Sequence, residues 1–503
     1  MSLPRKAYPR RVLRLLAPLT AAAMLLSGCG SSDNSVFSLV VIGEPDDPFE
    51  TGARLSLAGQ LARSATAEGL VSFDEQGRVV PALADRWIVT DDGQSYIFRL
   101  REGNWRNGDS LTARSAQTAL NAAIRSLRGT PMAQDLSGID EVRAMAGRVI
   151  EVRLFRPMPF LLQILAQPEL GLVHDKQGDG PMTMTRSGNQ ARFTPIDPSR
   201  LGLPKIAQWS SRTRQLELSA VSAADAVRQF NAGDVDLVLG GKIQSFPLTS
   251  SVGILRGTIQ LDPVIGLFGL RVAKRDGFLA EAGNREALAM AIDRAALIGP
   301  FGVGGWNAST RLVSGSVQGD LTPSQERWQA LTIDQRRATA AARVRTWLAA
   351  TRPDGGTSPP TVSIWLPEGP GAQIIFNRLE SDFRAIGVEA VRAKQVSSAD
   401  LRLVDEAARF PRVSWFLNRL TCDSPSDLCD PDADALITSA IKVTDPAQRA
   451  GLLAQAERKL TDDNIFIPFG APIRWSLVRG DVDGFAANAW GWHPLMPLAW
   501  LHK

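Results

Sequence analysis

Residues 69 to 111 read GLVSFDEQGRVVPALADRWIVTDDGQSYIFRLREGNWRNGDSL, and the interpretation of the whole chain begins with them. Residues 70–73 form a short apolar run, residues 74–77 are turn formers, and residues 78–80 are a second run with two valines. Two such runs around a turn predict a β-hairpin. Pro81 is expected to end it, because proline lacks the backbone N–H that a sheet ladder uses.

A strand and a helix are predicted next. Residues 91–93 signal a turn, and after it the apolar residues alternate as they do in a strand with one buried face. The residues on that face are Tyr96, Phe98 and Leu100. Thr112 then precedes residues 113–127, whose apolar positions have helical spacing. Nothing in this block is chemically reactive.

The order of these pieces follows a known sequence pattern. The pattern reads E-G-L-x-x-F-D-x-x-G-x-x-x-P-x-L-A-x-x-W, then D-G-x-x-Y-x-F-x-L-R and W-x-x-G. This chain matches it at residues 68–87, 92–101 and 105–108. In this respect it resembles the family 5 extracellular solute-binding proteins, the peptide- and oligopeptide-binding components of ABC importers.

Two later segments extend the resemblance. Residues 222–233 predict a capped helix and residues 235–239 an alternating strand, similar to the family pattern A-x-x-x-x-x-A-G-x-V-D-x-V. Residues 284–298 have the spacing of one helix and resemble V-R-x-A-L-x-x-A-I-D-R-x-x-L-I. Asp293 and Arg294 in that helix are interpreted as a cap or a local ion pair rather than as catalytic residues.

The C-terminal half predicts an α/β sheet. Residues 362–366, 372–386 and 388–396 read strand, helix, strand, which is typical of a parallel pair. Residues 430–434 (DPDAD) superficially resemble a calcium loop but lack its glycine and final glutamate, so they predict a helix start. Residues 465–469 predict a returning strand.

The resemblance implies an α/β, two-lobed periplasmic-binding-protein fold, type II-like, with the extra domain typical of peptide-binding members. A chain of 503 residues is too long for one core and suggests about three structural units. The expected boundaries are a signal peptide at 1–28, a tether at 29–35, lobe I at 36–53 plus 178–265 plus 466–503, the extra domain at 54–177, and lobe II at 266–465.

The N-terminus is predicted to be a lipoprotein signal. Five basic residues precede an apolar run at residues 15–27, which is short for a membrane span. Residues 26–29 (LSGC) then resemble a lipobox, so Cys29 is the expected lipidation site. The alternative is a simple signal peptide with a chance cysteine. The expected location is the periplasm or cell envelope, with the protein anchored to a membrane by lipid on Cys29.

Composition describes an ordinary soluble globular protein, with 44% hydrophobic and 21% charged residues. Without residues 1–28 the 56 basic residues fall to 51 against 52 acidic ones, a net charge of −1. No basic block with interleaved aromatic residues follows, so no nucleic-acid partner is predicted.

Cys422 and Cys429 form an even pair once Cys29 is lipidated, and they flank a loop rich in turn formers. A disulfide is the favoured interpretation. A metal site would need at least two further ligands, and the histidines at 174, 493 and 502 are not at metal-ligand spacing from the cysteines. Neither a metal nor a cofactor is predicted.

The ligand site is predicted from the family resemblance. The loop after the first predicted strand, residues 37–42, approaches the ligand in the family, so Asp46 and Asp47 are candidate cleft acids, although both could be simple turn formers. Three tryptophans could supply stacking walls, but core packing is the safer assignment for any one of them. They are Trp306, Trp415 and Trp490.

One departure from the family pattern bears on the ligand. Peptide-binding members often carry G-W-x-A-D-Y-x-x-P, whose aspartate pairs with the ligand's α-ammonium. On alignment, Arg409 stands at the aspartate and Glu406 at the tryptophan. We therefore expect an acidic or N-blocked solute recognised by Arg409 or Arg412, or an amine bound by Glu406. Alternatively the alignment slips and both arginines are solvated. Trp415 completes the set of candidate ligand-binding residues.

The resemblance implies a monomeric, non-enzymatic binding protein. It would capture a peptide or peptide-like solute between two lobes by hinge closure and deliver it to an ABC permease and ATPase complex. A sensing or chaperone-like lipoprotein of the same fold is the first alternative. A secreted hydrolase is less well supported, because the sequence has no G-x-S-x-G and no H-E-x-x-H.

Overall fold

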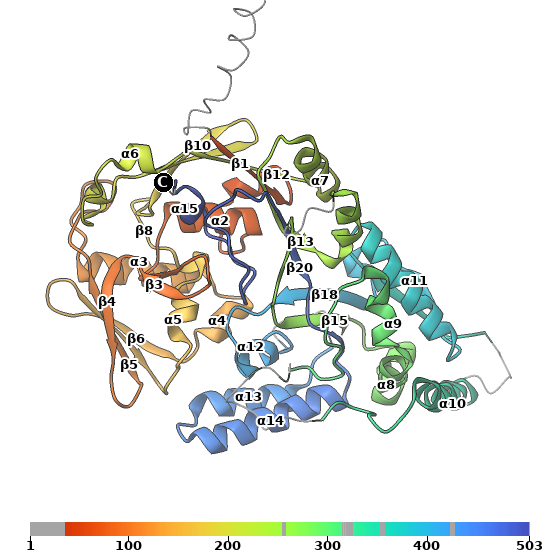
Figure 1. Ribbon diagram of the computed structural model, residues 1–503. Coiled ribbons are helices and arrows are strands. Elements are labelled where there is room, and N and C mark those ends of the chain that lie inside the picture. The colour runs from red at the N-terminus through yellow and green to blue at the C-terminus, as the bar shows by residue number, and fades with distance from the viewer. Residues whose placement is uncertain are drawn as a thin grey trace, which may run out of the picture. The chain divides into compact units, whose positions relative to one another are not determined.

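The computed structural model describes residues 36–253, 258–313, 315, 317, 325–351, 358–422 and 428–501. Phe37–Lys503 forms one compact unit (Figure 1). The predicted signal peptide, lipobox and tether, with Cys29, lie outside the described residues. Within the described part of the chain, no helix is long and apolar enough to cross a membrane.

A seven-stranded mixed sheet has the first strand of the unit in its interior (Figure 1). In sheet order its strands are β10 (Met182–Ser187), β11 (Gln190–Pro195), β12 (Leu216–Val221), β1 (Phe37–Ile42), β13 (Leu237–Lys242), β20 (Arg474–Val478) and β14 (Ile259–Asp262). β1 is parallel to β12 and β13, whereas β20 is antiparallel to both of its neighbours. The strand predicted at residues 37–42 is confirmed. So is the capped helix that precedes β13, α7 (Ala223–Ala232).

A five-stranded sheet collects segments from the C-terminal half. In sheet order its strands are β17 (Glu389–Arg392), β16 (Thr361–Trp365), β18 (Leu401–Ala407), β15 (Gly266–Val272) and β19 (Phe466–Gly470). β16 and β17 are parallel and α11 (Pro370–Arg384) joins them, which confirms the predicted strand, helix, strand unit. The apolar face of α11 is buried in the core against this sheet.

The opening stretch forms a hairpin and part of a four-stranded antiparallel sheet. β2 (Val71–Phe73) pairs with β3 (Val79–Pro81), and Thr112 caps α3 (Ala113–Ser126), both as predicted. The sheet order is β4 (Ala84–Val89), β5 (Ser95–Leu100), β7 (Val149–Leu154) and β6 (Ile139–Ala144). β4 was not predicted, because it is an edge strand whose residues are mostly exposed and so show no apolar alternation.

The single helix predicted at residues 284–298 is wrong. Two helices occupy it, α8 (Ala282–Ala291) and α9 (Arg294–Ile298), with extended backbone at Ile292. The Asp293 N–H donates to Asp382 Oδ2 (3.1 Å), and the Asp293 carboxylate accepts from Ala296 N (3.0 Å). Asp293 is therefore a cap, as predicted, but of a new helix.

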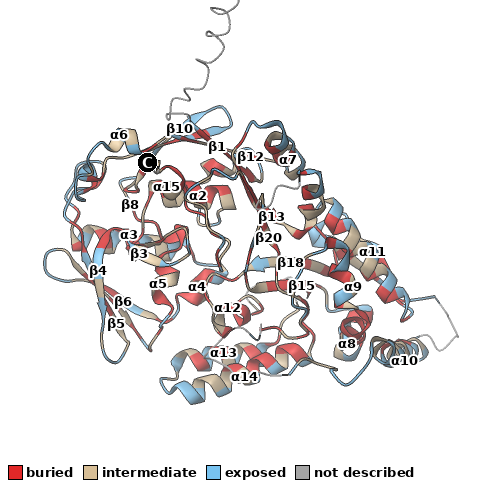
Figure 2. Ribbon diagram, viewed as in Figure 1, coloured by how far each residue is buried: buried red, intermediate tan, exposed pale blue. Residues whose placement is uncertain are grey.

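The remaining elements complete the layers around the sheets. The longer ones are α2 (Leu57–Thr66), α10 (Ile333–Thr351), α13 (Pro431–Lys442) and α14 (Pro446–Asp462). The shorter ones are α4 (Pro131–Asp135), α5 (Leu161–Leu165), β8 (Val173–His174), β9 (Gln177–Gly178), α6 (Trp209–Arg212), α12 (Val413–Leu417) and α15 (Leu495–Leu498). Buried residues, red in Figure 2, run through the strands and line the inward faces of the helices. Asp430 caps α13, so the helix start predicted at residues 430–434 is confirmed.

Cys422 and Cys429 form the predicted disulfide, with their Cα atoms 5.1 Å apart. The bond closes a short loop between α12 and α13. Replacing both cysteines with serine is expected to lower the free energy of unfolding by about 2–3 kcal/mol, because the cross-link restricts the unfolded chain. Urea denaturation of both proteins measures this. Equal stability of the two proteins would contradict it.

Candidate functional site

One cavity of about 490 Å³ is lined from both larger sheets. The seven-stranded sheet contributes the ends of β13, β14 and β20, and the five-stranded sheet contributes the end of β18. The turn that follows α5 adds Gln167, and residues 490–493 near the C-terminus close one side. A cavity built from non-consecutive segments of two sheets is a typical place for a small ligand.

Four of the six candidate ligand-binding residues line this cavity. They are Asp47, Glu406, Arg409 and Trp415. Asp46 does not: its side chain is 82% exposed and pairs with Arg186 (2.7 Å). Arg412 lines a separate cavity of about 220 Å³, where its guanidinium lies 5.9 Å from the ring centre of Phe160. Asp47 also stabilises the local turn, since its Oδ2 accepts from Glu44 N (2.9 Å).

Arg409 has an internal carboxylate partner. Its Nη1 donates to Glu169 Oε2 (2.8 Å) and to Gln167 Oε1 (3.1 Å), both near the end of α5. Burial opposes the charge on Arg409, but the attraction and hydrogen bond to Glu169, together with attraction to Glu406 and Asp135, outweigh burial and raise the pKa of the arginine. The positive charge that stands where the family has an aspartate is therefore compensated within the protein.

The Glu406 carboxylate is more accessible to solvent than the Asp405 and Asp262 carboxylates in the same cavity. Its side chain is 56% exposed, and its Oε2 lies 3.5 Å from Arg419 Nε. Arg419 is shared with the buried Asp135 (3.4 Å) and packs on the Trp415 ring at 3.9 Å. Because Arg419 also pairs with Asp135, and because Glu406 is largely exposed, the Glu406 carboxylate can still bind a group in the cavity.

Sequence reasoning missed several polar residues that line the same cavity. They are Lys242, Asp262, Asp405, Arg474 and His493. Arg474 pairs with Asp405 (2.6 Å), and His493 Nε2 lies 3.1 Å from Asp262 Oδ2. Each of these residues lies at or near a strand end or in an irregular segment, where polar residues are common. The glycine pair just before Lys242 was the one usable sequence signal.

Trp490 joins the cavity wall to the β2–β3 hairpin. Its Nε1 donates to Gly77 O (2.8 Å), and Asn488 Nδ2 donates to Glu75 O (3.3 Å). Of the other predicted stacking residues, Trp415 is fully buried, which fits core packing. Trp306 lies outside this cavity, in a neighbouring one of about 660 Å³.

The turn at Gly77 is expected to require glycine. Its φ is +74°, and a Cβ there would lie 2.6 Å from Trp490 Cδ1. Gly77→Ala should lower the free energy of unfolding by about 2–3 kcal/mol through strain and overpacking. Gly147→Ala is the matched control, because its φ is +63° but nothing lies within 4 Å, so it should cost only about 1 kcal/mol. Equal losses in urea denaturation would show that the Trp490 contact is unimportant.

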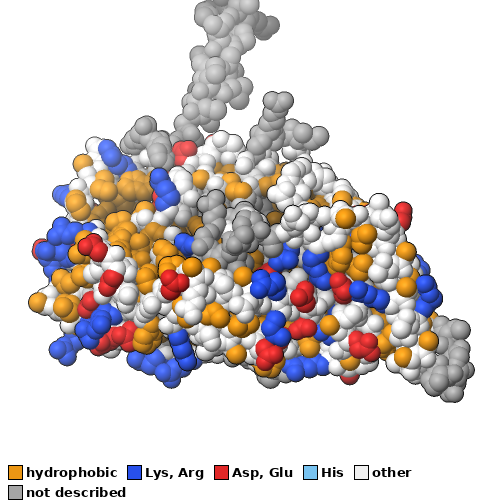
Figure 3. All heavy atoms as spheres, turned by 90° about the horizontal axis from the view of Figure 1, so that it is seen from below, with side chains coloured by type: hydrophobic (Ala, Val, Ile, Leu, Met, Phe, Trp, Pro, Cys, Tyr) orange, Lys and Arg blue, Asp and Glu red, His pale blue; other side chains and the backbone are white. Residues whose placement is uncertain are grey.

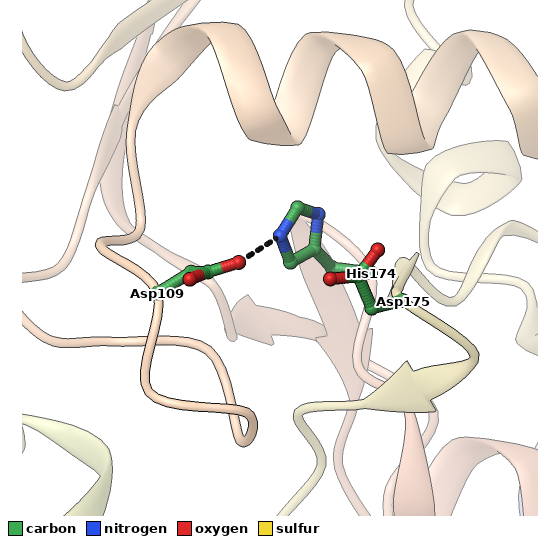
Figure 4. Close-up of side chains that lie close together, drawn as sticks. All are labelled: Asp109, His174 and Asp175. Carbon is green, nitrogen blue, oxygen red and sulfur yellow. Dashed lines mark hydrogen bonds and ion pairs between the residues drawn. The ribbon is translucent and has the colours of Figure 1, made fainter.

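Three potential metal ligands lie together at the β8–β9 hairpin (Figure 4). The ligand atoms of Asp109, His174 and Asp175 are within 4.8 Å of one another, and His174 Nε2 lies 2.9 Å from Asp109 Oδ2. Asn107 Nδ2 donates to both carboxylates, at 2.8 and 3.0 Å. Chiefly the hydrogen bond with His174 lowers the pKa of Asp109. These contacts indicate a structural role for the cluster, in which it connects the 105–109 loop to the β8–β9 hairpin.

The comparison with known families decides what kind of protein carries this cavity. Residues 78–409 match the profile of the bacterial extracellular solute-binding proteins, family 5 Middle. The chain belongs to this family. The resemblance read from the sequence is thereby confirmed. Members of family 5 are solute-binding proteins of ABC importers that bind peptides or related ligands.

Individual relatives agree with this assignment. The family 5 chain is 25% identical over 474 residues to the probable deoxycholate-binding periplasmic protein YgiS of Escherichia coli, a match covering 83% of this chain and 84% of that protein. The OppA structure of Haemophilus influenzae, solved with the peptide RPPGFSPFR, has a TM-score of 0.75 at 17% identity and covers 93% and 100% of the two chains. OppA of Burkholderia pseudomallei has the same TM-score at 20% identity, with 94% and 100% covered. The predicted two-lobed α/β fold is confirmed.

Proposed function

We propose that this protein captures a peptide or peptide-like solute in the 490 Å³ cavity by closing two lobes around it, and delivers it to a membrane permease. The observation that carries the proposal is that this cavity takes its walls from both larger sheets and contains the exposed carboxylate of Glu406. Residues 263–265 run from β14 directly into β15, and residues 471–473 run from β19 into β20. Two short crossings of this kind are suited to a hinge.

The proposed lobes follow the sheets. Lobe I holds the seven-stranded sheet, lobe II the five-stranded sheet, and the extra domain the four-stranded sheet. The proposed boundaries are those expected from the sequence, except that lobe II is proposed to extend to Gly470, because β19 pairs with β15. Cys29 is proposed to anchor the protein by lipid in the periplasm.

The solute is proposed to carry an amine that Glu406 binds. The sequence suggested either an acidic or N-blocked solute recognised by Arg409 or Arg412, or an amine bound by Glu406, and the first of these loses support. Arg409 is paired with Glu169, and Arg412 lines another cavity. Glu406 has the open carboxylate. The cavity volume lies in the lower part of the range of about 300–1,000 Å³ that small ligands occupy, which favours a short solute.

Native mass spectrometry of protein purified without refolding tests this function. We expect an added mass of a small, amine-bearing solute that is lost on denaturation and refolding, and that restores the melting temperature when added back. On the face in Figure 3, basic and acidic side chains are interspersed, so this face favours neither sign of partner. A preparation that retains no solute, and that no member of a peptide panel stabilises, would contradict the proposal.

A further inference from the structure

Lys242 is held at the cavity by an unusual piece of backbone. It ends β13, and the pairing of β13 with β20 shifts register between Val238 and Gly241, as in a β-bulge. Gly240 has φ +85°, and a Cβ on Gly241 would lie 2.1 Å from the Trp475 ring. Bulges of this kind redirect the side chains that follow them. The bulge therefore brings Lys242 to the cavity wall.

As far as the structure describes the chain, the Lys242 main chain is hydrogen-bonded, whereas its ammonium group is not. The indole Nε1 of the buried Trp475 donates to the Lys242 carbonyl oxygen at 2.9 Å. Among the residues that the structure describes, none accepts a hydrogen bond from the Lys242 ammonium or lies in an ion pair with it. A rigid backbone with an unengaged cation is the arrangement expected of a recognition residue.

The other cations of the cavity differ from Lys242 in this respect. Arg409 pairs with Glu169, Arg419 with Asp135, and Arg474 with Asp405. Each has a carboxylate within the protein. Within the described part of the chain, Lys242 is thus the cation of this cavity that has no carboxylate partner. Glu406 is the exposed carboxylate of the same cavity.

The surroundings of Lys242 make this charge costly in the empty cavity. Burial is the main cause that lowers the pKa of Lys242, and repulsion by Arg474 lowers it further. Attraction to Asp405 and Glu406 offsets these two effects only in part. Asp405 pairs with Arg474 through its Oδ1 at 2.6 Å, and among the described residues it forms no ion pair with Lys242. An anionic group from outside the protein would complete the pairing, because a partly buried charge is stabilised when it gains a partner.

We infer that Lys242 forms a subsite for a carboxylate of the solute. The inference rests on the proposed function, in which Glu406 holds the amine of the same solute. Lys242 lies in the seven-stranded sheet and Glu406 in the five-stranded one, so a solute bound to both would join the two walls of the cavity. The solute class is then a short zwitterion with a free amine and a free carboxylate, such as a very short peptide.

The test compares matched probes on matched variants. The probes are alanyl-alanine, alanyl-phenylalanine and trialanine, each as the free acid and as the C-terminal amide, titrated by calorimetry into the full mature protein. The variant is Lys242→Gln, and the control is Lys205→Gln, which makes the same change of charge at an exposed loop. We expect wild type and control to bind the acids at least about 10-fold tighter than the amides, and Lys242→Gln to lose this preference.

The possible outcomes distinguish failure of the carboxylate subsite from failure of the proposed solute capture. Equal binding of acids and amides by wild type, or a preference that survives in Lys242→Gln, would overturn the carboxylate subsite while leaving solute capture intact. Binding of no probe in either form would overturn the proposed peptide-like solute and the subsite with it. The melting temperature of unliganded Lys242→Gln should not fall below that of wild type, because the substitution removes an uncompensated charge. A marked fall would indicate a structural role instead.

Discussion

Replacing Arg101 with methionine is expected to lower the free energy of unfolding by about 3–5 kcal/mol at neutral pH, because it leaves two carboxylates buried without a partner. The Arg101 side chain is 3% exposed. Its Nη1 donates to Glu68 Oε2 and its Nη2 to Asp179 Oδ2, each at 2.9 Å. Nη1 also donates to Ala82 O at 3.1 Å.

Urea denaturation at neutral pH measures this effect. Arg99→Met is the matched control, since Arg99 lies two residues earlier on β5 but is exposed, and it should change stability by no more than about 0.5 kcal/mol. Similar losses in the two variants would contradict the assignment of Arg101 as a buried ion-network residue.

The loss in Arg101→Met should also shrink as the pH falls. Burial raises the pKa of Glu68 and of Asp179, and Arg101 acts against it in both. Without Arg101 the folded-state pKa values rise further above the unfolded value of about 4. A carboxyl with a raised folded-state pKa gains stability as the pH falls through that pKa, because the folded state then binds more protons. A penalty that stays constant from pH 7.5 to about pH 5 would argue against buried carboxylates as its cause.

Replacing Glu406 with glutamine is expected to weaken binding of an amine-bearing solute by about 10–100-fold, the usual worth of a hydrogen bond to a charged group. The Glu406 carboxylate is open to the cavity and has only a 3.5 Å contact with Arg419. Because glutamine keeps the shape but not the charge, the fold should be unaffected.

Calorimetry with the solute identified by native mass spectrometry measures this loss. Glu389→Gln provides the control, as Glu389 is an exposed residue of β17 in the same sheet. It should leave the affinity within about 2-fold of wild type, since a distant exposed charge is screened by solvent. Unchanged affinity in Glu406→Gln would remove Glu406 from the proposed site.

The parts of the fold that were predictable from sequence depend on local rules. The turn at Gly77, the cap at Thr112 and the helix end at Gly233 each follow from residues within four positions of one another. The ion network at Arg101 explains why the opening motif is informative although unreactive. Glu68 and Arg101 belong to two separate pieces of the opening pattern, and they meet Asp179 in one ion cluster.

The parts that were missed depend on partners distant in sequence. Recognition of an acidic solute by Arg409 was one of the alternatives expected from the sequence, which could not show that Glu169, 240 positions away, pairs with this arginine. The break at Ile292 depends on Asp382, which accepts the Asp293 N–H. Lys242 escaped notice because only the folded structure shows which strand ends share a cavity. Sequence patterning reports a residue's neighbours along the chain and not those across the sheets.

The most direct test of solute capture by closure is a distance between the two lobes. Spin labels at Ser187→Cys in β10 and Ser381→Cys in α11, both exposed, report on the seven- and five-stranded sheets in a Cys29→Ala background. Pulsed electron spin resonance with and without the solute measures the separation. The account predicts a shorter and narrower distance distribution when solute saturates the protein. An unchanged distribution, with solute shown by calorimetry to be bound, would contradict it.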